Sequence, residues 1–446
     1  MTQGSALDVL KMGYSVFLTG PAGSGKTFLL NKYIKYLKKN KVGVGITAST
    51  GIAATHINGR TIHSWAGIGI NRELTEKDIA RISRQKILRQ RISNTKVLVI
   101  DEISMLHDYQ LDMVDEICRK VKKNSLAFGG IQVILCGDFF QLPPVPEKGK
   151  KSYFVNNSKV CIEENIRACY LDKYQYRQKD ENFIKLLSQI RKNNVDDNLK
   201  DMLLERMHKP IKDFSDPLKF YAINYKVDAI NNFKLTQVDG EEKIYDMVSN
   251  GPEGLVKSLK KWCLAPEKLI LKNGAIVMFL KNNFNAGYIN GTTGKVIGFT
   301  ENNYPIVKVI SGREIIAVPD SWVIEQEDGD VLASINQIPL KLAWAITVHK
   351  SQGMTLDAAE IDLSRSFEYG MGYVALSRVR SLDGIKLMGL NDLALMVSED
   401  AIKLDKELRE NSKKTEKELK NKKNEIAPSA TLSVAMRAGT FFTNFK

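Results

Sequence analysis

One short segment restricts the fold of this chain more than any other. The pattern G-x-x-x-x-G-K-[ST] is matched by Gly20-Pro21-Ala22-Gly23-Ser24-Gly25-Lys26-Thr27. The segment follows the apolar run Val16-Phe17-Leu18, typical of a buried strand, and precedes a helical pattern that begins near Thr27. Glycines let backbone N–H groups converge on phosphate oxygens, and a helix N-terminus favours negative charge. The sequence therefore predicts a phosphate-binding loop between a strand and a helix.

A second segment supplies the acidic groups that such a loop needs. The apolar strand Val97–Ile100 ends at Asp101 and Glu102. Asp101 is expected beside a metal ion and Glu102 beside the attacking water, while Lys26 reaches the β- and γ-phosphates and Thr27 holds Mg²⁺. Acidic residues are common at strand ends, so this interpretation depends on the loop before it. Together the two segments predict a P-loop NTPase with ATP and Mg²⁺ as cofactors, and leave its kind open.

Short apolar runs alternate with helical patterns over the first 140 residues, at 16–18, 42–47, 97–100 and 131–136. This alternation favours an α/β fold whose parallel sheet is covered on both faces. A second set of α/β signals begins near residue 168 and resumes after 340. Between them, short β-like runs with Gly and Asn turns favour a small antiparallel barrel inserted in the second α/β domain.

The chain is long enough for about three domains at roughly 150 residues each. We predict a first α/β domain at 1–167, with a polar, Arg-rich insertion at about 66–95. The second α/β domain is predicted at 168–267 and 339–400, with the barrel at 268–338. Residues 401–446 are predicted to form a charged helix and a disordered tail. A solvated helix is favoured because its apolar heptads are not sustained.

The net charge of +14 suggests a polyanionic partner. Residues 403–423 contribute only +4 of it, so +10 belongs to the rest of the chain. The five cysteines are scattered without a Cys-x-x-Cys pair, which argues against disulfides or a metal site and favours a reducing compartment. No apolar run approaches the roughly 20 residues that span a bilayer, and the first residues do not resemble a signal peptide. We expect a soluble, intracellular protein.

Further motifs follow the P-loop in a fixed order. They are Thr47–Ala54, Thr61–Trp65, Asp101–Met105, Gly129–Pro144, Tyr176–Gln178, Thr347–Thr355 and Tyr373–Arg378. This set resembles the Pif (petite integration frequency) family of superfamily 1 DNA helicases, relatives of RecD and Dda, from about Gln3 to Leu390. The resemblance implies two RecA-like domains with parallel sheets. It also implies a wedge (1B) at the 66–95 insertion and an SH3-like barrel (2B) at 268–338.

The resemblance also implies further nucleotide contacts. Arg177 and Arg378 correspond to two arginines that reach the γ-phosphate from the second α/β domain, where cationic groups assist phosphoryl transfer. Surface ion pairing is the alternative for both. Gln141 corresponds to a γ-phosphate sensor, although its place alone would suggest a turn residue. Gln3 resembles an adenine-reading glutamine, close to a terminus where fraying is common. Phe28 and Gly353 complete the implied nucleotide site.

Single-stranded DNA is held through phosphate contacts and aromatic surfaces. The resemblance assigns such contacts in both domains, to Thr50, Gly51, His63, Ser64, Thr347, His349 and Lys350. A lone histidine is more often a core or capping residue, but the position of His63 within Thr61–Trp65 favours the DNA contact. Trp65 suits either the core or a base-stacking role, and the sequence does not decide between them.

The family resemblance implies an ATP-dependent DNA helicase that moves 5′ to 3′ on single-stranded DNA. Tailed or forked duplex DNA is the expected partner, G-quadruplex DNA is a further candidate, and a monomer is expected. The implied roles are replication, repair, recombination and genome maintenance, including telomere maintenance. Such a protein would act in the cytoplasm or nucleoid of a prokaryote or virus, or in a eukaryotic nucleus or mitochondrion. The alternative is a DNA-stimulated ATPase that remodels nucleoprotein without separating strands.

Overall fold

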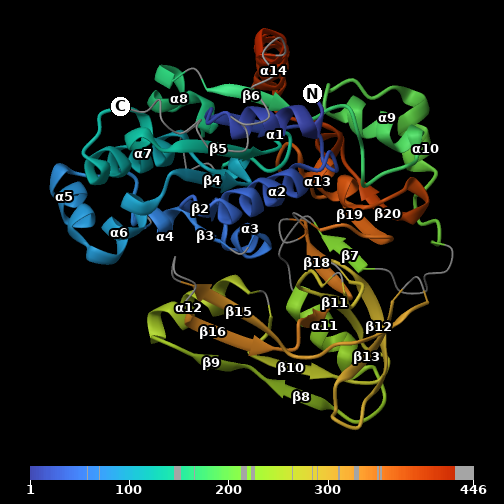
Figure 1. The fold of residues 1–446 in the computed structure, drawn as a ribbon. Helices are drawn as coiled ribbons and strands as arrows, with labels where there is room; N and C mark the ends of the chain where they lie inside the picture. Colours follow the sequence, from blue (N-terminus) through green and yellow to red (C-terminus); the bar gives the residue numbers. More distant parts are fainter. Residues whose placement is uncertain are drawn as a thin grey trace. The chain divides into compact units, whose positions relative to one another are not determined.

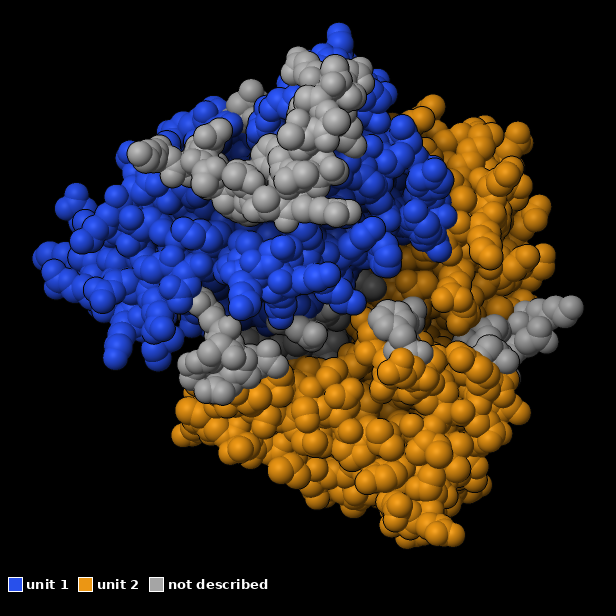
Figure 2. Space-filling model, viewed as in Figure 1, with its two compact units in different colours: residues 1–50, 57–176, 399–446 blue, residues 51–56, 177–398 orange. Residues whose placement is uncertain are grey.

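The computed structural model of the chain (Figure 1) describes residues 1–57, 59–69, 71–144, 152–164, 166–211, 218–221, 227–263, 265–283, 285–288, 290–309, 312–325, 331–348, 351 and 354–426. The chain divides into two compact units, coloured separately in Figure 2. Unit 1 comprises Met1–Thr50, Ile57–Tyr176 and Glu399–Lys446, and unit 2 comprises Gly51–His56 and Arg177–Ser398.

Unit 1 is built on a six-stranded sheet in the order β3-β2-β4-β5-β1-β6. All of its strand pairs are parallel. The central strands are buried along their whole length, which explains their continuous apolar runs. The strands are β1 (Val16–Thr19), β2 (Val44–Ala48), β3 (Arg60–Thr61), β4 (Val97–Asp101), β5 (Gln132–Gly137) and β6 (Arg167–Tyr170).

Helices cover this sheet because each of them has an apolar face. On α2 (Lys26–Lys39), Leu30 and Tyr33 are buried at helical spacing, and they share a core cluster with Leu10 of α1 (Gln3–Lys11) and Cys136 of β5. Burying each large apolar side chain stabilises the fold by about 1.5–3 kcal/mol. The other helices of unit 1 are α4 (Ile62–Ala66), α5 (Glu76–Arg84), α6 (Lys86–Asn94), α7 (Asp108–Lys122), α8 (Lys159–Glu164) and α14 (Glu399–Ile426).

The Arg-rich insertion contains α5 and α6. A capping box begins α5. The Thr75 hydroxyl accepts a hydrogen bond from the backbone N–H of Asp78, and the Asp78 carboxylate accepts one from the backbone N–H of Thr75. The buried apolar anchors are Ile82 of α5 and Leu88 and Ile92 of α6, while the remaining side chains of these helices are exposed or half-buried.

Two features of unit 1 differ from the sequence-based expectations. We predicted a domain boundary at 167/168, but β6 pairs with β1, and unit 1 continues to Tyr176. The prediction of a solvated C-terminal helix is wrong, because α14 packs on β6 and buries one face. That face alternates Leu404, Leu408 and Leu419 with the small polar residues Ser412 and Thr415, so it lacks a heptad pattern. The predicted tail at 427–446 lies outside the described residues.

Unit 2 contains a second parallel sheet in the order β18-β7-β19-β20. Its strands are β7 (Leu218–Tyr221), β18 (Ala345–Thr347), β19 (Ala359–Leu363) and β20 (Ile385–Leu390). The helices of unit 2 are α3 (Gly51–His56), α9 (Glu181–Ile190), α10 (Asp197–Leu204), α11 (Val227–Thr236), α12 (Glu253–Trp262) and α13 (Met371–Arg378). The two parallel sheets confirm the predicted α/β class.

The remainder of unit 2 is antiparallel. A five-stranded sheet in the order β14-β13-β12-β11-β17 surrounds a core that includes Val277, Phe279, Val296 and Leu340. Its strands are β11 (Ile276–Phe279), β12 (Thr293–Phe299), β13 (Pro305–Val309), β14 (Glu314–Ile316) and β17 (Leu340–Leu342). Two smaller sheets contain β8 (Lys243–Asp246), β9 (Val248–Asn250), β10 (Lys268–Leu271), β15 (Asp320–Glu325) and β16 (Val331–Gln337).

The five cysteines are all buried and free of disulfides. Within the described ranges, no helix has the length and apolar character needed to cross a membrane.

Candidate nucleotide site

The predicted phosphate site lies at the carboxyl edge of the unit 1 sheet. The loop that begins at Gly20 follows β1, Asp101 ends β4, and Gln141 follows β5. Thr19 is level with Gly137 across the β1–β5 pair, so these three strands end at the same edge. Ligands of open parallel sheets bind at this edge, where the strand order reverses.

Two glycines give the loop a shape that no other residue would allow. Gly20 has a φ of +146°, and a Cβ on it would lie 2.4 Å from the carbonyl oxygen of Leu171. Gly25 has a φ of +85°, and a Cβ there would lie 2.2 Å from Nε2 of Gln3. Both positions combine left-handed backbone with close neighbours, so the loop forms a tight cradle of backbone groups.

The side chains of the loop suit a polyanion. The Lys26 amine donates to the loop's own carbonyl oxygens, to Gly20 at 2.8 Å and to Pro21 at 3.0 Å. Ser24 is 2% exposed, and its Oγ has no hydrogen-bond partner among the described residues. A buried hydroxyl without a partner is costly, and a phosphate oxygen would satisfy it. These groups therefore fit a nucleotide phosphate chain.

Beside the loop, Asp101 has a shifted pKa and Glu102 has an uncommon backbone conformation. Burial raises the pKa of the Asp101 carboxyl, whereas the Glu102 amide, which donates to Oδ1 at 2.9 Å, and the Lys26 charge oppose that rise. Glu102 has a φ of +51°, in the left-handed region that non-glycine residues rarely adopt. Ser49 holds this backbone, because its amide donates to the Asp101 carbonyl and its hydroxyl to the Glu102 carbonyl.

The acidic groups alone do not form a metal centre. No group of three or more His, Cys, Asp or Glu residues that could hold a metal occurs in the part of the chain that the structure describes. Asp101 and the exposed Thr27 at the start of α2 supply one carboxylate and one hydroxyl. Mg²⁺ is commonly held by one or two carboxylates together with phosphate oxygens and water. The residues present therefore fit a Mg²⁺ ion that arrives with a nucleotide.

The other predicted nucleotide residues of unit 1 are Gln3, Phe28 and Gln141. Gln3 donates through Nε2 to the Ser24 and Gly25 carbonyls at 3.4 and 3.3 Å, so it is near the loop. Its helix α1 is capped by the Thr2 side chain. Gln141 is 6% exposed, and its Oε1 lacks a hydrogen-bond partner among the residues that are described. Phe28, two residues beyond Lys26, is 66% exposed.

Sequence reasoning missed a segment that touches the loop from the side. The side-chain amide of Gln175 donates through Nε2 to the Ala22 carbonyl at 2.8 Å. The backbone N–H of Tyr176 donates to the Gly23 carbonyl at 2.9 Å. Tyr174 and Tyr176 are both exposed, with ring centroids 6.1 Å apart. Tyr176 belongs to the Tyr176–Gln178 motif, whereas Tyr174 and Gln175 could have been indicated only by their position immediately before it.

In unit 2, the two predicted arginines meet around one residue. Arg177 donates through Nη1 to the Ser377 carbonyl at 2.9 Å. Arg378 is 1% exposed and donates to the Val374 carbonyl and the Ser377 hydroxyl, each at 3.0 Å. Gln178 binds the Ser377 and Val379 carbonyls. Two arginines 201 positions apart are therefore fixed to the same end of α13.

The residues predicted to bind DNA have varied surroundings. Thr50 ends the first segment of unit 1, and Gly51 begins α3 in unit 2. His63 and the exposed Ser64 lie on α4, and burial lowers the pKa of His63 below its ordinary 6.5. Thr347 is buried in β18. The predicted contacts His349 and Lys350, together with the nucleotide contact Gly353, lie outside the described residues.

The structure decides the role that the sequence left open for Trp65. This side chain is 1% exposed and belongs to the interior of unit 1. A Cβ on Gly45 of β2 would lie 2.8 Å from its Nε1, so the indole packs directly on the strand. Trp65 is therefore a core residue in this structure and offers no open ring face for a DNA base.

Comparison with known proteins places this site in a family. The family described as PIF1-like helicase matches residues 5–201, and the family described as DNA helicase Pif1, 2B domain, matches residues 254–299. The chain is 44% identical over 454 residues to the ATP-dependent DNA helicase Pif1 of Psychrobacter sp., an alignment that covers 89% of this chain and 69% of that protein.

Solved structures agree with that match. A structure titled as Bacteroides sp Pif1 in complex with ADP-AlF4 is similar with a TM-score of 0.78 and 30% identity, over 92% of this chain and 96% of that one. A structure titled as Bacteroides Pif1 bound to ssDNA has a TM-score of 0.61 and 31% identity, over 93% and 97% of the two chains. The chain therefore belongs to the Pif1 family of ATP-dependent DNA helicases.

Proposed function

We propose that ATP binds at Gly20–Thr27 and is hydrolysed there with Lys26, Asp101 and Glu102 as the principal catalytic residues. The observation that carries this proposal is the cradle formed by Gly20 and Gly25, together with the buried Ser24 hydroxyl, which has no hydrogen-bond partner among the described residues. When phosphates bind, the Lys26 amine exchanges the Gly20 and Pro21 carbonyls for phosphate oxygens. A similar structure, titled as Bacteroides sp Pif1 in complex with ADP-AlF4, supports nucleotide binding by this chain.

Asp101 and Thr27 are proposed to hold Mg²⁺. The bound ion would neutralise charge on the phosphate oxygens. Glu102, held in its left-handed conformation next to Asp101, is proposed to accept a proton from the attacking water. Gln141, whose buried Oε1 has no partner in the described part of the chain, is proposed to orient that water or sense the γ-phosphate.

Arg177 and Arg378 are proposed to stabilise the charge that develops on the γ-phosphate. Both are bound to Ser377, so a movement of α13 would shift them together. Gln3, Phe28 and Gly353 are proposed as further nucleotide contacts. Because Gln3 already donates to two carbonyls of the loop, a nucleotide and the loop would share this amide.

We further propose that the protein moves 5′ to 3′ along single-stranded DNA and unwinds tailed, forked or structured duplexes as a monomer. A relative whose structure is titled as bound to ssDNA and the +10 charge outside residues 403–423 both support a DNA track. The proposed contacts are Thr50, Gly51, His63, Ser64, Thr347, His349 and Lys350. The proposed biological roles are replication, repair, recombination and genome maintenance, including telomere maintenance. G-quadruplex DNA is proposed as a further DNA partner.

One experiment separates this function from its rival, a translocase that remodels nucleoprotein without separating strands. A tailed duplex is incubated with ATP, and strand release is followed together with ATP turnover. Release of the short strand with turnover supports the helicase. DNA-stimulated turnover without release on either tail polarity supports the rival.

A further inference from the structure

The unit 1 sheet has an edge at β6, which pairs with β1 and, among the described strands, with no other. Helix α14 covers this edge (Figure 1). The N–H of Ala168 donates to Oδ1 of Asn411 at 3.1 Å, and the N–H of Tyr170 donates to Oγ of Ser412 at 2.9 Å. Alternate amides along a sheet edge need partners from outside the sheet. The side chains of α14 therefore take the place of a further strand.

Charged and aromatic groups strengthen the same contact. The Tyr170 hydroxyl donates to Asp405 at 2.6 Å and accepts from Arg409 at 2.6 Å, and the Arg409 guanidinium lies 4.0 Å from the centre of the Tyr170 ring. Arg409 also lies 3.6 Å from the Asp172 carboxylate. The end of β6 is thus held by both its backbone and its side chain.

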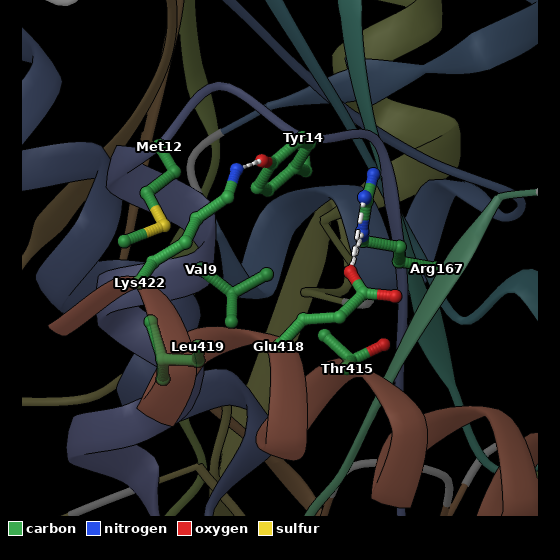
Figure 3. A pocket seen from close by; sticks show the side chains of 8 residues that line it. All are labelled: Val9, Met12, Tyr14, Arg167, Thr415, Glu418, Leu419 and Lys422. Carbon is green, nitrogen blue, oxygen red and sulfur yellow. Dashed lines mark hydrogen bonds and ion pairs between the residues drawn. The ribbon is translucent and has the colours of Figure 1, made fainter. Parts of the chain in front are cut away.

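Farther along α14, further pairs fix the helix on unit 1. Figure 3 shows Glu418 directed at Arg167, the first residue of β6, and Lys422 directed at the hydroxyl of Tyr14. The Glu418 and Arg167 groups are 3.1 Å apart. Leu419 is buried in the same core as α1 and α2. The helix is therefore docked on the edge over several turns.

The strand that α14 covers leads directly to the P-loop. Leu171 follows β6, and its carbonyl oxygen is the atom that a Cβ on Gly20 would strike. Four residues later, Gln175 binds the Ala22 carbonyl, and the N–H of Tyr176 binds the Gly23 carbonyl. One short segment thus connects the α14 contact to the backbone of the phosphate cradle.

We propose that α14 positions the Leu171–Tyr176 segment against the P-loop, which makes Asn411 and Ser412 positioning residues for ATP binding. The inference rests on the proposed function, in which ATP binds at Gly20–Thr27. Without the two side-chain acceptors, the outer amides of β6 lose their partners, and the segment is free to move away from the loop carbonyls. The affinity for ATP falls, whereas the catalytic groups on α2 and β4 stay in place.

The test uses the full chain with two double variants on one helix. Asn411→Ala/Ser412→Ala removes both acceptors, and Lys413→Ala/Lys414→Ala changes two adjacent exposed residues as a control. Steady-state ATP turnover is measured with saturating oligo-dT, and thermal unfolding reports folding. The acceptor variant is expected to raise KM for ATP about fivefold or more and to change kcat less than about twofold. The control is expected to match the wild type.

A third variant tests the route. Gln175→Ala cuts the link between the segment and Ala22, so it should also raise KM, and its effect should be less than additive with the acceptor variant. Ser412→Thr keeps the hydroxyl and should retain a KM close to that of the wild type. The inference is overturned if the acceptor variant folds and keeps the KM of the wild type. It is also overturned if the effects of the acceptor variant and of Gln175→Ala on KM add in full.

Two safeguards keep the outcome decisive. If the double acceptor variant does not fold, Asn411→Ala alone decides the matter, and an unchanged KM in it overturns the inference. Lys26→Ala distinguishes a failure of this inference from a failure of the proposed ATP site. Turnover by Lys26→Ala contradicts the proposed ATP site itself, whereas an inactive Lys26→Ala beside an unaffected α14 variant contradicts only the role of the helix.

Discussion

The P-loop geometry predicts a measurable difference between two glycines that have nearly the same positive φ. Gly25 in the loop has a φ of +85° and Gly13 after α1 has a φ of +84°. A Cβ on Gly13 would meet nothing within 4 Å, whereas one on Gly25 would lie 2.2 Å from Nε2 of Gln3 and 3.2 Å from the Tyr176 ring. Replacement by alanine therefore imposes the strain of a positive φ at both sites and a collision only at Gly25.

The magnitudes follow from these contacts. Left-handed backbone costs an alanine about 1–2 kcal/mol, and the lower entropy of the unfolded chain returns about 0.4–1 kcal/mol. Gly13→Ala should therefore destabilise the fold by about 0–1.6 kcal/mol, with a central value of about 1 kcal/mol. Gly25→Ala must also move the Gln3 amide away from the Ser24 and Gly25 carbonyls. Losing these two long hydrogen bonds adds about 1 kcal/mol, for about 2 kcal/mol in all.

Urea unfolding of both variants and of the wild type measures this difference, and ATP turnover measures its effect on the site. Gly25→Ala should raise KM for ATP by about tenfold or more, because the added methyl group disturbs both the loop and its neighbours. Gly13→Ala should leave KM unchanged. Equal destabilisation of the two variants, together with an unchanged KM for Gly25→Ala, would refute the proposed cradle.

Three further predictions concern catalysis, pH and salt. Lys26→Ala and Glu102→Gln should both abolish ATP turnover, and Glu102→Gln should still bind a fluorescent ATP analogue; appreciable turnover by either variant contradicts its role. Because burial lowers the pKa of His63 below 6.5, the unfolded chain takes up this proton more readily, so stability falls as pH drops from 7.5 to 5.5. Urea unfolding of His63→Gln should show a weaker pH dependence, and an unchanged one counts against this account. In a fluorescence titration, log K for oligo-dT should fall with log salt by a slope of several units, and a flat response means that the charge serves another purpose.

The parts of the site that could be predicted from the sequence are those whose structure is local. The loop between β1 and α2 and the acidic end of β4 each follow from a strand, a turn and a helix within about 30 residues. Arg177 and Arg378 could be predicted only through the family resemblance, because the residues next to them in the sequence do not indicate that both bind Ser377. The bond between Arg177 and Ser377 joins residues 200 positions apart.

Long-range packing explains what the sequence did not reveal. The pattern of β6 fits either parallel sheet, and only its pairing with β1 assigns it to unit 1. Helix α14 lacks a continuous apolar stripe because Asn411 and Ser412 face the edge amides of β6. Gln175 belongs to no recognised pattern, since its contact is with the carbonyl of Ala22, 153 positions earlier.

ATP hydrolysis at Gly20–Thr27 is proposed to drive directional unwinding of DNA. The most direct measurement compares strand release from a 5′-tailed and a 3′-tailed duplex of the same sequence, with ATP, for the wild type and Lys26→Ala. The account predicts rapid release from the 5′-tailed duplex by the wild type alone. Release by Lys26→Ala, equal release from both duplexes, or release from the 3′-tailed duplex only would contradict it.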